Sequence, residues 1–339
     1  MQGFLHRTAQ TALVSLLLLI FVGATVRATG SGLGCPDWPT CWGCLVPPWK
    51  ASQIDPARLD LERFRRNAER HGIDPATITP DTVLSRFNPV HTWVEFVNRL
   101  TSLPLGLSTL VLFLAAFSAR RHRVWLCVVA FLSLADVIGN AWLGAEVVHS
   151  GLKPGVITTH MALAFALICL LTTAVRLTAD PGGRPAVEIG PLRRRIVWVS
   201  VLFFGCLVTE GIMGSQVREH TDELAKSAGQ LDRAEWTGIL EQTGIYLIHR
   251  SASWSLLVTS ALLLFWIRCS QRPGAMRPRL LFAGVLAMMV MGVILAHVAV
   301  FRVVQVLHVG LTAVLLSVAW GWLLELFTAD LVAKEATRT

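Results

Sequence analysis

Two histidines at the ends of apolar segments have the type and placement needed to bind an iron-containing group. His249 and His308 stand near the starts of long apolar runs, in "IYLIHRSASW" and "VVQVLHVGLTA". A histidine in a membrane segment is costly unless it has a partner, so it indicates a functional site. Two imidazoles on neighbouring helices can ligate a haem iron from both sides. We therefore predict His249 and His308 as axial haem ligands, with Arg218 and Arg250 neutralising the propionates.

A related pattern in the first half of the chain lacks one of the two histidines. His160 corresponds to His308, but Asn98 occupies the position that corresponds to His249. An amide does not replace imidazole as an iron ligand, so the pattern does not predict a second bis-histidine haem. The first half is instead expected to hold a haem through His160.

A carboxylate lies close to Asn98 on the same predicted helix. Glu95 precedes Asn98 by three residues and so shares its helix face, with Arg99 beside it and Arg27 on the first span. Such a carboxylate can accept a proton or stabilise positive charge that develops on a substrate. We predict Glu95 as the catalytic group and Asn98, Arg99 and Arg27 as substrate-pocket residues. The alternative is a structural ion pair between Glu95 and an arginine.

Two further histidines are candidates for completing this pocket. His91 lies one turn before Glu95, and His149 lies at the end of the third apolar run, near Glu146. Either side chain is placed to supply the missing ligand or a proton path. For both residues the alternative is an ordinary loop or interface histidine.

These candidate residues belong to an unusually apolar chain. Its 339 residues are 53% hydrophobic and 15% charged, whereas a soluble domain carries about 25% charged residues. Eight apolar runs are long enough to cross a hydrocarbon layer of about 30 Å as helices. The sequence thus predicts an all-α integral membrane protein with eight transmembrane helices. The predicted spans are residues 9–28, 98–118, 124–147, 156–176, 196–215, 245–267, 279–299 and 304–326.

The net charge of +8 follows the order of these spans. Arginines cluster at alternate ends of successive spans, on the side that also carries both termini. This positive-inside pattern predicts cytoplasmic termini and argues against a nucleic-acid partner. No A-x-A cleavage site follows the first span and no Arg/Ser-rich transit segment precedes it. We therefore expect an uncleaved, multi-pass protein of the bacterial cytoplasmic (inner) membrane.

The two halves of the chain repeat the same order of motifs. "GATVRATGSG" in the first half corresponds to "GIMGSQVREHTD" in the second. In each half two histidines lie eleven residues apart, His149 with His160 and His297 with His308. A segment rich in Gly, Pro and Arg, residues 176–195, is expected to link the halves in the cytoplasm. We predict two tandem pseudo-symmetric four-helix bundles, residues 1–180 with a long outer loop and residues 190–339.

The first outer loop contains three of the seven cysteines, Cys35, Cys41 and Cys44. Oxidation is permitted on the outer side of a bacterial membrane. A disulfide from Cys35 to Cys41 or Cys44 is favoured over a zinc site, because three thiols lack an obvious fourth ligand.

The same loop contains a segment with alternating apolar and charged residues. In "IDPARLDLERFRRNAERHG" the apolar residues Leu59, Leu61 and Phe64 stand among charges. This pattern predicts a short amphipathic helix at the membrane surface, placed as a lid over the first bundle. The alternative is a solvated surface helix.

Together, these motifs resemble the haem A synthase family over essentially the whole chain. "GATVRATGSGLGCPDWPTCWG" resembles the first-loop signature of the family, and "EFVNR" stands at its Glu-x-x-His-Arg element. "GLKPGVITTHMALA", "IYLIHRSASW" and "VVQVLHVGLTA" resemble its other histidine-bearing elements. The chain departs from the family at Asn98, where a histidine is usual.

The resemblance implies an enzyme that oxidises the C8 methyl group of haem O to the formyl group of haem A for terminal oxidases. It implies a haem b on His249 and His308 in the C-terminal bundle, and a substrate site with Glu95 and His160 in the N-terminal bundle. The outer-loop cysteines resemble the disulfide of the family. The implied partners are haem O, the lipid bilayer, an electron donor and a haem O synthase, whereas oligomeric state is not indicated.

Two other function classes are alternatives to a synthase. A di-haem b-type electron-transfer cytochrome, or a haem-binding relative without synthase activity, would be expected to carry two bis-histidine haems, and Asn98 counts against it. A transporter would place its binding residues near the membrane midplane, whereas these histidines cluster at one membrane face.

Overall fold

The computed structural model describes residues 1–70, 74–179, 190–227, 238–270 and 276–336. In these ranges the secondary structure is helical, apart from an isolated bridge between Cys41 and Cys44. Eight of the described helices are long and apolar enough to cross a membrane. They are α1 (Gln2–Ala28), α4 (Pro89–Ser118), α5 (Val124–His149), α6 (Pro154–Thr178), α7 (Arg193–Ser227), α9 (Gly244–Cys269), α10 (Met276–His297) and α11 (Arg302–Ala336). The prediction of an all-α, multi-pass membrane protein with eight spans is confirmed.

Helix α4 extends beyond the apolar run of residues 98–118 at its N-terminal end. It starts at Pro89, and the Asn88 side chain accepts hydrogen bonds from the N–H groups of Val90 and His91. Proline fits the first helical position that follows such a cap. Glu95 therefore lies inside a continuous helix.

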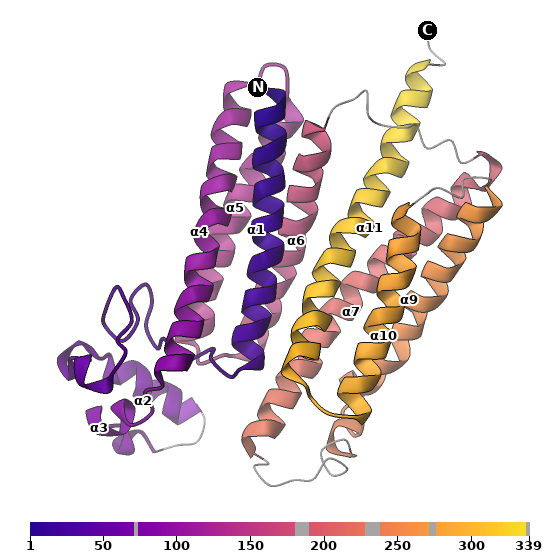
Figure 1. Ribbon diagram of the computed structural model, residues 1–339. Helices are drawn as coiled ribbons and strands as arrows, with labels where there is room; N and C mark the ends of the chain where they lie inside the picture. Colours follow the sequence, from indigo (N-terminus) through magenta and orange to yellow (C-terminus); the bar gives the residue numbers. More distant parts are fainter. Residues whose placement is uncertain (71–73, 180–189, 228–237, 271–275, 337–339) are drawn as a thin grey trace.

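The membrane helices form two groups with the same neighbour order (Figure 1). In the first group α1 contacts α4, α4 contacts α5, α5 contacts α6, and α6 contacts α1. Helices α7, α9, α10 and α11 contact one another in the same cyclic order. This arrangement is compatible with two tandem bundles. Residues 180–189 of the predicted linker, and residues 228–237, lie outside the described residues.

The two groups pack against each other through α11, which contacts both α1 and α6, and through α6 and α7. Glycines allow this close approach: a Cβ atom on Gly211 would lie 2.6 Å from the Phe165 ring, and one on Gly310 would overlap the Phe21 ring. Small residues at helix crossings are typical of membrane proteins. The Thr172 and Ser317 hydroxyls add an inter-helix hydrogen bond of 2.9 Å.

The outer loop between α1 and α4 has a small core of its own. It contains α2 (Leu61–Arg70), α3 (Pro80–Leu84) and the 3-10 turns Ala51–Gln53, Pro56–Arg58 and Pro75–Thr77. The predicted amphipathic helix is present as α2, and Leu59, Leu61 and Phe64 pack against the buried Trp42 cluster of this loop. Part of the apolar face of α2 is thus covered by the loop. Its place at the membrane surface stays a prediction.

Candidate functional site

A continuous cavity of about 2750 Å³ extends through both groups of helices. All eight membrane helices contribute to its lining. Sites for ordinary small molecules occupy about 300–1,000 Å³, so this cavity is large enough for more than one bulky ligand. The three predicted iron ligands, His160, His249 and His308, all line it.

In the second group of helices, each predicted haem ligand lies against a glycine of a neighbouring helix. A Cβ atom on Gly214 of α7 would be 3.3 Å from His249 Cε1, and one on Gly292 of α10 would be 3.9 Å from His308 Cε1. His308 Nδ1 is buried and has no hydrogen-bond partner among the described residues. Both imidazoles therefore pack against glycines on the cavity wall, and His308 Nδ1 is not engaged in a separate polar network of the described residues.

The first group of helices repeats this arrangement with one substitution. His160 Cε1 lies 3.7 Å from the Cβ position of Gly144, and Asn98 Oδ1 lies 3.8 Å from that of Gly23. Asn98 thus occupies the place that His249 has in the second group. Asn98 Oδ1 and His160 Nδ1 are both buried, and neither has a hydrogen-bond partner in the described part of the chain. Unpartnered buried polar atoms beside a cavity are what a site for a polar or metal-centred ligand requires.

The correspondence between these glycines can also be found in the sequence. "GATVR" at residues 23–27 aligns with "GSQVR" at 214–218, which places Gly23 with Gly214. Gly144 precedes His160 by sixteen residues, as Gly292 precedes His308.

Glu95 belongs to a buried ion pair that also lines the cavity. Its side chain is only 4% exposed, and Oε1 accepts a 2.7 Å hydrogen bond from Arg99 Nη2. Oε2 accepts a 2.8 Å hydrogen bond from the Cys35 N–H. The structural ion pair considered as an alternative is thus formed, and both residues also line the cavity.

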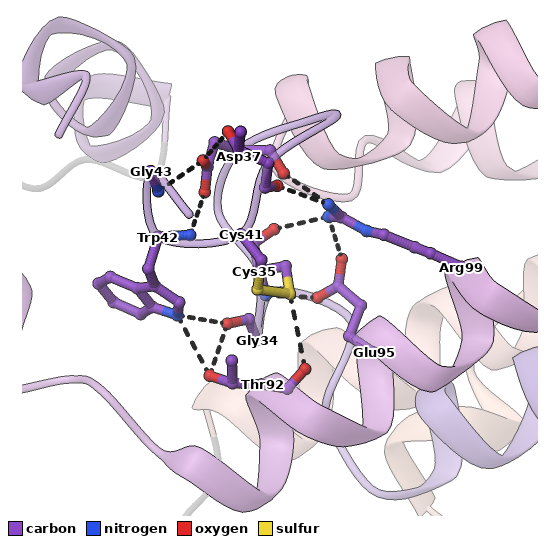
Figure 2. Close-up of a disulfide and its surroundings, with 10 residues drawn as sticks. Gly34, Cys35, Asp37, Cys41, Trp42, Gly43, Thr92, Glu95 and Arg99 are labelled. Carbon is purple, nitrogen blue, oxygen red and sulfur yellow. Dashed lines mark hydrogen bonds and ion pairs between the residues drawn. A yellow bond between two sulfur atoms is a disulfide. The ribbon is translucent and has the colours of Figure 1, made fainter. Parts of the chain in front are cut away.

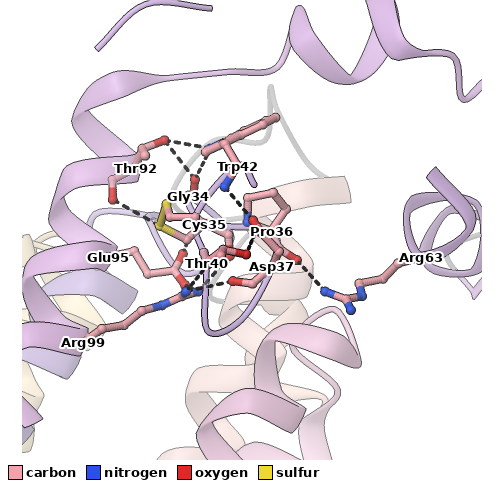
Figure 3. A network of polar contacts seen from close by, with 11 residues as sticks. Gly34, Cys35, Pro36, Asp37, Thr40, Trp42, Arg63, Thr92, Glu95 and Arg99 are labelled. Atoms are coloured by element: carbon pink, nitrogen blue, oxygen red, sulfur yellow. Dashed lines mark hydrogen bonds and ion pairs between the residues drawn. A yellow bond between two sulfur atoms is a disulfide. The ribbon is translucent and has the colours of Figure 1, made fainter. Parts of the chain in front are cut away.

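Arg99 attaches the outer loop to α4 (Figure 3). It donates hydrogen bonds to the backbone oxygens of Cys35, Asp37 and Thr40 at 3.0, 2.8 and 2.8 Å. Its guanidinium therefore bridges the carboxylate of Glu95 and the turn of the loop. Because a planar guanidinium donates in several directions at once, a lysine would not reproduce this set of bonds.

The loop cysteines form the disulfide Cys35–Cys41, and Cys44 is free (Figure 2). This selects one of the two predicted pairings, and the alternative three-thiol zinc site is wrong. The Asp37 carboxylate closes the turn between the cysteines, because it accepts hydrogen bonds from the Trp42 and Gly43 N–H groups at 2.6 and 2.8 Å.

The same loop is docked on the first turns of α4. Trp42 Nε1 donates to the Gly34 oxygen at 2.7 Å and to Thr92 Oγ1 at 3.1 Å. A Cβ atom on Gly34 would overlap the backbone of His91, so only glycine permits this approach. The loop consequently covers the end of α4 that carries Glu95.

The predicted arginines also line the cavity. Arg218 donates a hydrogen bond to Gln305 Oε1 and a 3.4 Å bond to the Arg27 backbone oxygen, so it joins the two groups of helices. Arg250 is about half exposed and pairs with Glu241 at 3.0 Å. Their contacts with propionates stay predictions.

Among the described residues, the cavity lining includes neither His91 nor His149. His149 Nε2 is nevertheless buried without a hydrogen-bond partner in the described structure. The structure therefore does not bring these two histidines into the candidate site, and their predicted roles are not supported by their placement.

Sequence reasoning missed one acidic residue. Glu210 on α7 is 5% exposed, lines the cavity, and places Oε2 2.7 Å from His249 Nδ1. The signal was its position as a lone acid in the apolar stretch "VLFFGCLVTEGIMG". An ionisable residue inside a membrane span is a functional candidate by default.

Comparison with known proteins gives a consistent result. The family model described as "Cytochrome oxidase assembly protein" (COX15-CtaA) matches residues 7–320. The chain is 27% identical over 305 residues to a protein of Shouchella clausii named "Heme A synthase", covering 87% of this chain and 86% of that protein.

Two further similar proteins carry the same name. One, from Halalkalibacterium halodurans, is 23% identical and covers 75% of this chain and 72% of its own length. The other, from Shewanella oneidensis, is 29% identical over 159 residues, 47% of this chain and 41% of that protein.

Proposed function

We propose that this chain, which belongs to the COX15-CtaA family of cytochrome oxidase assembly proteins, is a haem A synthase that acts on haem O. The reaction oxidises the C8 methyl group of haem O to a formyl group. The main support for this proposal is that His160, His249 and His308 line one cavity in a chain of this family.

The second group of helices, within residues 190–339, is proposed to hold a haem b. His249 and His308 would hold it, and the glycines against their rings keep the adjacent helices close. Bound there, haem b supplies a one-electron carrier. Arg218 and Arg250 lie on the same cavity and provide positive charge for propionates.

The first group of helices, within residues 1–180, is proposed to hold the substrate. His160 supplies the single imidazole, and Asn98 lies where the second group has a histidine. An amide at this position would contact the substrate without acting as a strong iron ligand. Arg27 lines the same part of the cavity and supplies positive charge.

Glu95 is proposed as the acidic group at this substrate site. Its two hydrogen bonds, from Arg99 and from the Cys35 N–H, fix the carboxylate at the cavity wall. A fixed carboxylate stabilises positive charge on a substrate, or receives a proton at Oε1 or Oε2, without first having to reorganise. Trp38 of the outer loop also lines the cavity.

The reaction needs components beyond this chain. We propose that haem O is delivered by a haem O synthase and that a separate donor supplies electrons. The clustering of arginines at one end of the helices supports cytoplasmic termini in a bacterial cytoplasmic membrane. The outer loop with its disulfide then faces the oxidising side.

Haem extraction tests the proposed activity. Membranes of a host that makes haem O, with and without this chain, are extracted and their haems are separated by chromatography. A haem A peak that depends on the chain is expected. Haem O and haem B alone, in membranes that contain the folded chain and a reductant, would contradict the proposal.

A further inference from the structure

The second group of helices contains a buried carboxylate that the proposed function does not use. Glu210 Oε2 and His249 Nδ1 are 2.7 Å apart, and the Glu210 side chain is 6% exposed. The contact is close enough for an ion pair, but it lacks hydrogen-bond geometry, and the described residues offer neither atom another hydrogen-bond partner. A rotation that aligned the ring with the carboxylate would break no other hydrogen bond of these atoms among the described residues.

A comparison of the two groups of helices shows that only the second group has a carboxylate at this position. Glu210 precedes Gly214 by four residues, and the residue four before Gly23 is Leu19, which also lines the cavity. Leu19 belongs to the half that has Asn98, whereas Glu210 belongs to the half that has His249. The acid is thus found only where the neighbouring helix carries a histidine.

Burying this acid costs free energy, so its position is unfavourable unless it has a role. A carboxylate removed from water loses its hydration unless a partner compensates. Its polar contact among the described residues is with His249, and the side chain at the corresponding place in the other half is apolar. The two groups of helices therefore share one arrangement, although only the second group carries an acid at this position.

We propose that Glu210 is a positioning residue for His249: its carboxylate accepts the Nδ1–H and so directs Nε2 toward the haem iron. This inference rests on the proposed ligation of haem b by His249. A carboxylate behind a metal-bound imidazole fixes its tautomer and orientation and makes it a stronger donor. A stronger donor favours ferric iron, so Glu210 lowers the midpoint potential of the haem b.

The chain offers a matched control for Glu210. Glu219 lies on the same helix and lines the same cavity, but its Oε1 accepts a 3.1 Å hydrogen bond from Thr158. Glu210→Gln and Glu219→Gln therefore make the same change of chemistry in one helix. Only the first change removes the carboxylate from His249.

The test is a redox titration of the purified full-length protein, with bound haem b followed by its absorption spectrum. We expect Glu210→Gln to raise the midpoint potential or to weaken haem b retention by about 10–100-fold, with Glu210→Asp restoring part of the effect. Glu219→Gln is expected to leave both quantities unchanged.

A wild-type potential and wild-type haem content in Glu210→Gln would overturn the inference, as would equal shifts in Glu210→Gln and Glu219→Gln. His249→Ala separates this failure from that of the proposed function. If His249→Ala keeps a normal haem b spectrum, the ligation itself is wrong. If it loses haem b while Glu210→Gln is unchanged, only the role of Glu210 is wrong.

Discussion

The N–H of Cys35 donates a 2.8 Å hydrogen bond to the Glu95 carboxylate, which ties the disulfide loop to the candidate catalytic group. Arg99 reinforces this link, because it binds Glu95 and the Cys35 oxygen together. The loop is therefore part of the structure that fixes Glu95 at the cavity. Predictions about the loop and about the cavity can be tested separately, since His249 and His308 lie in the other group of helices.

Removing the disulfide is expected to impair the substrate side only. Cys35→Ala/Cys41→Ala loosens the turn that donates to Glu95, and loss of so small a closed loop costs about 2 kcal/mol. We expect lower haem A formation and normal haem b content. Cys44→Ala is the control, since Cys44 is free. Full haem A formation by the double variant would show that the loop does not position Glu95.

Breaking the buried ion pair between Arg99 and Glu95 is expected to destabilise the fold far more than breaking an exposed ion pair on another helix. Arg99→Ala leaves Glu95 buried without its partner, which costs about 3–5 kcal/mol. Arg65 pairs with Glu62 at 2.6 Å on the exposed face of α2, so Arg65→Ala should cost about 0–1 kcal/mol. Thermal unfolding in detergent compares the two variants. Equal melting temperatures would contradict the assignment.

Loss of either proposed axial ligand is expected to remove haem b. His249→Ala and His308→Ala each leave the iron with one imidazole, so the purified proteins should lose the low-spin haem b spectrum. His122→Ala, on an exposed turn, is the control and should retain it. A normal spectrum in either of the first two variants would remove that residue from the ligand set.

The glycine beside His249 gives a test of the packing. In Gly214→Val the new Cβ would lie 3.3 Å from the His249 imidazole, and the valine methyl groups add further atoms there. We expect this overpacking to destabilise the fold by about 1–3 kcal/mol. Gly205→Val makes the same change on the same helix, where no atom lies within 4 Å of the Cβ position. We expect reduced haem b content in the first variant alone. Similar haem contents in the two variants would mean that Gly214 is not required for the site.

Much of the fold could be predicted from the sequence because membrane helices depend on a local property. Each span is a run of apolar residues long enough to cross the bilayer. The apolar run does not fix where α4 starts, because this boundary is set by the cap at Asn88 and Pro89. Hydropathy alone does not reveal such caps.

The candidate site was predictable only in part. Its histidines could be found from the repeated motifs, since each stands in a recognisable apolar segment. The choice of Cys41 over Cys44 depends on a turn closed by Asp37, and the hold on Glu95 depends on Gly34 lying against α4. Glu210 was missed because its role depends on a contact with another helix. Such contacts between distant residues are not encoded in spacing.

Glu95→Ala tests whether substrate chemistry and haem b binding belong to different groups of helices. In one membrane preparation, haem b is measured from its reduced-minus-oxidised spectrum and haem A by chromatography of the extracted haems. We predict normal haem b and a loss of haem A formation of about 10²–10⁴-fold, the usual contribution of an acid–base group. Haem A formation at the wild-type rate, or loss of haem b together with haem A, would contradict the account.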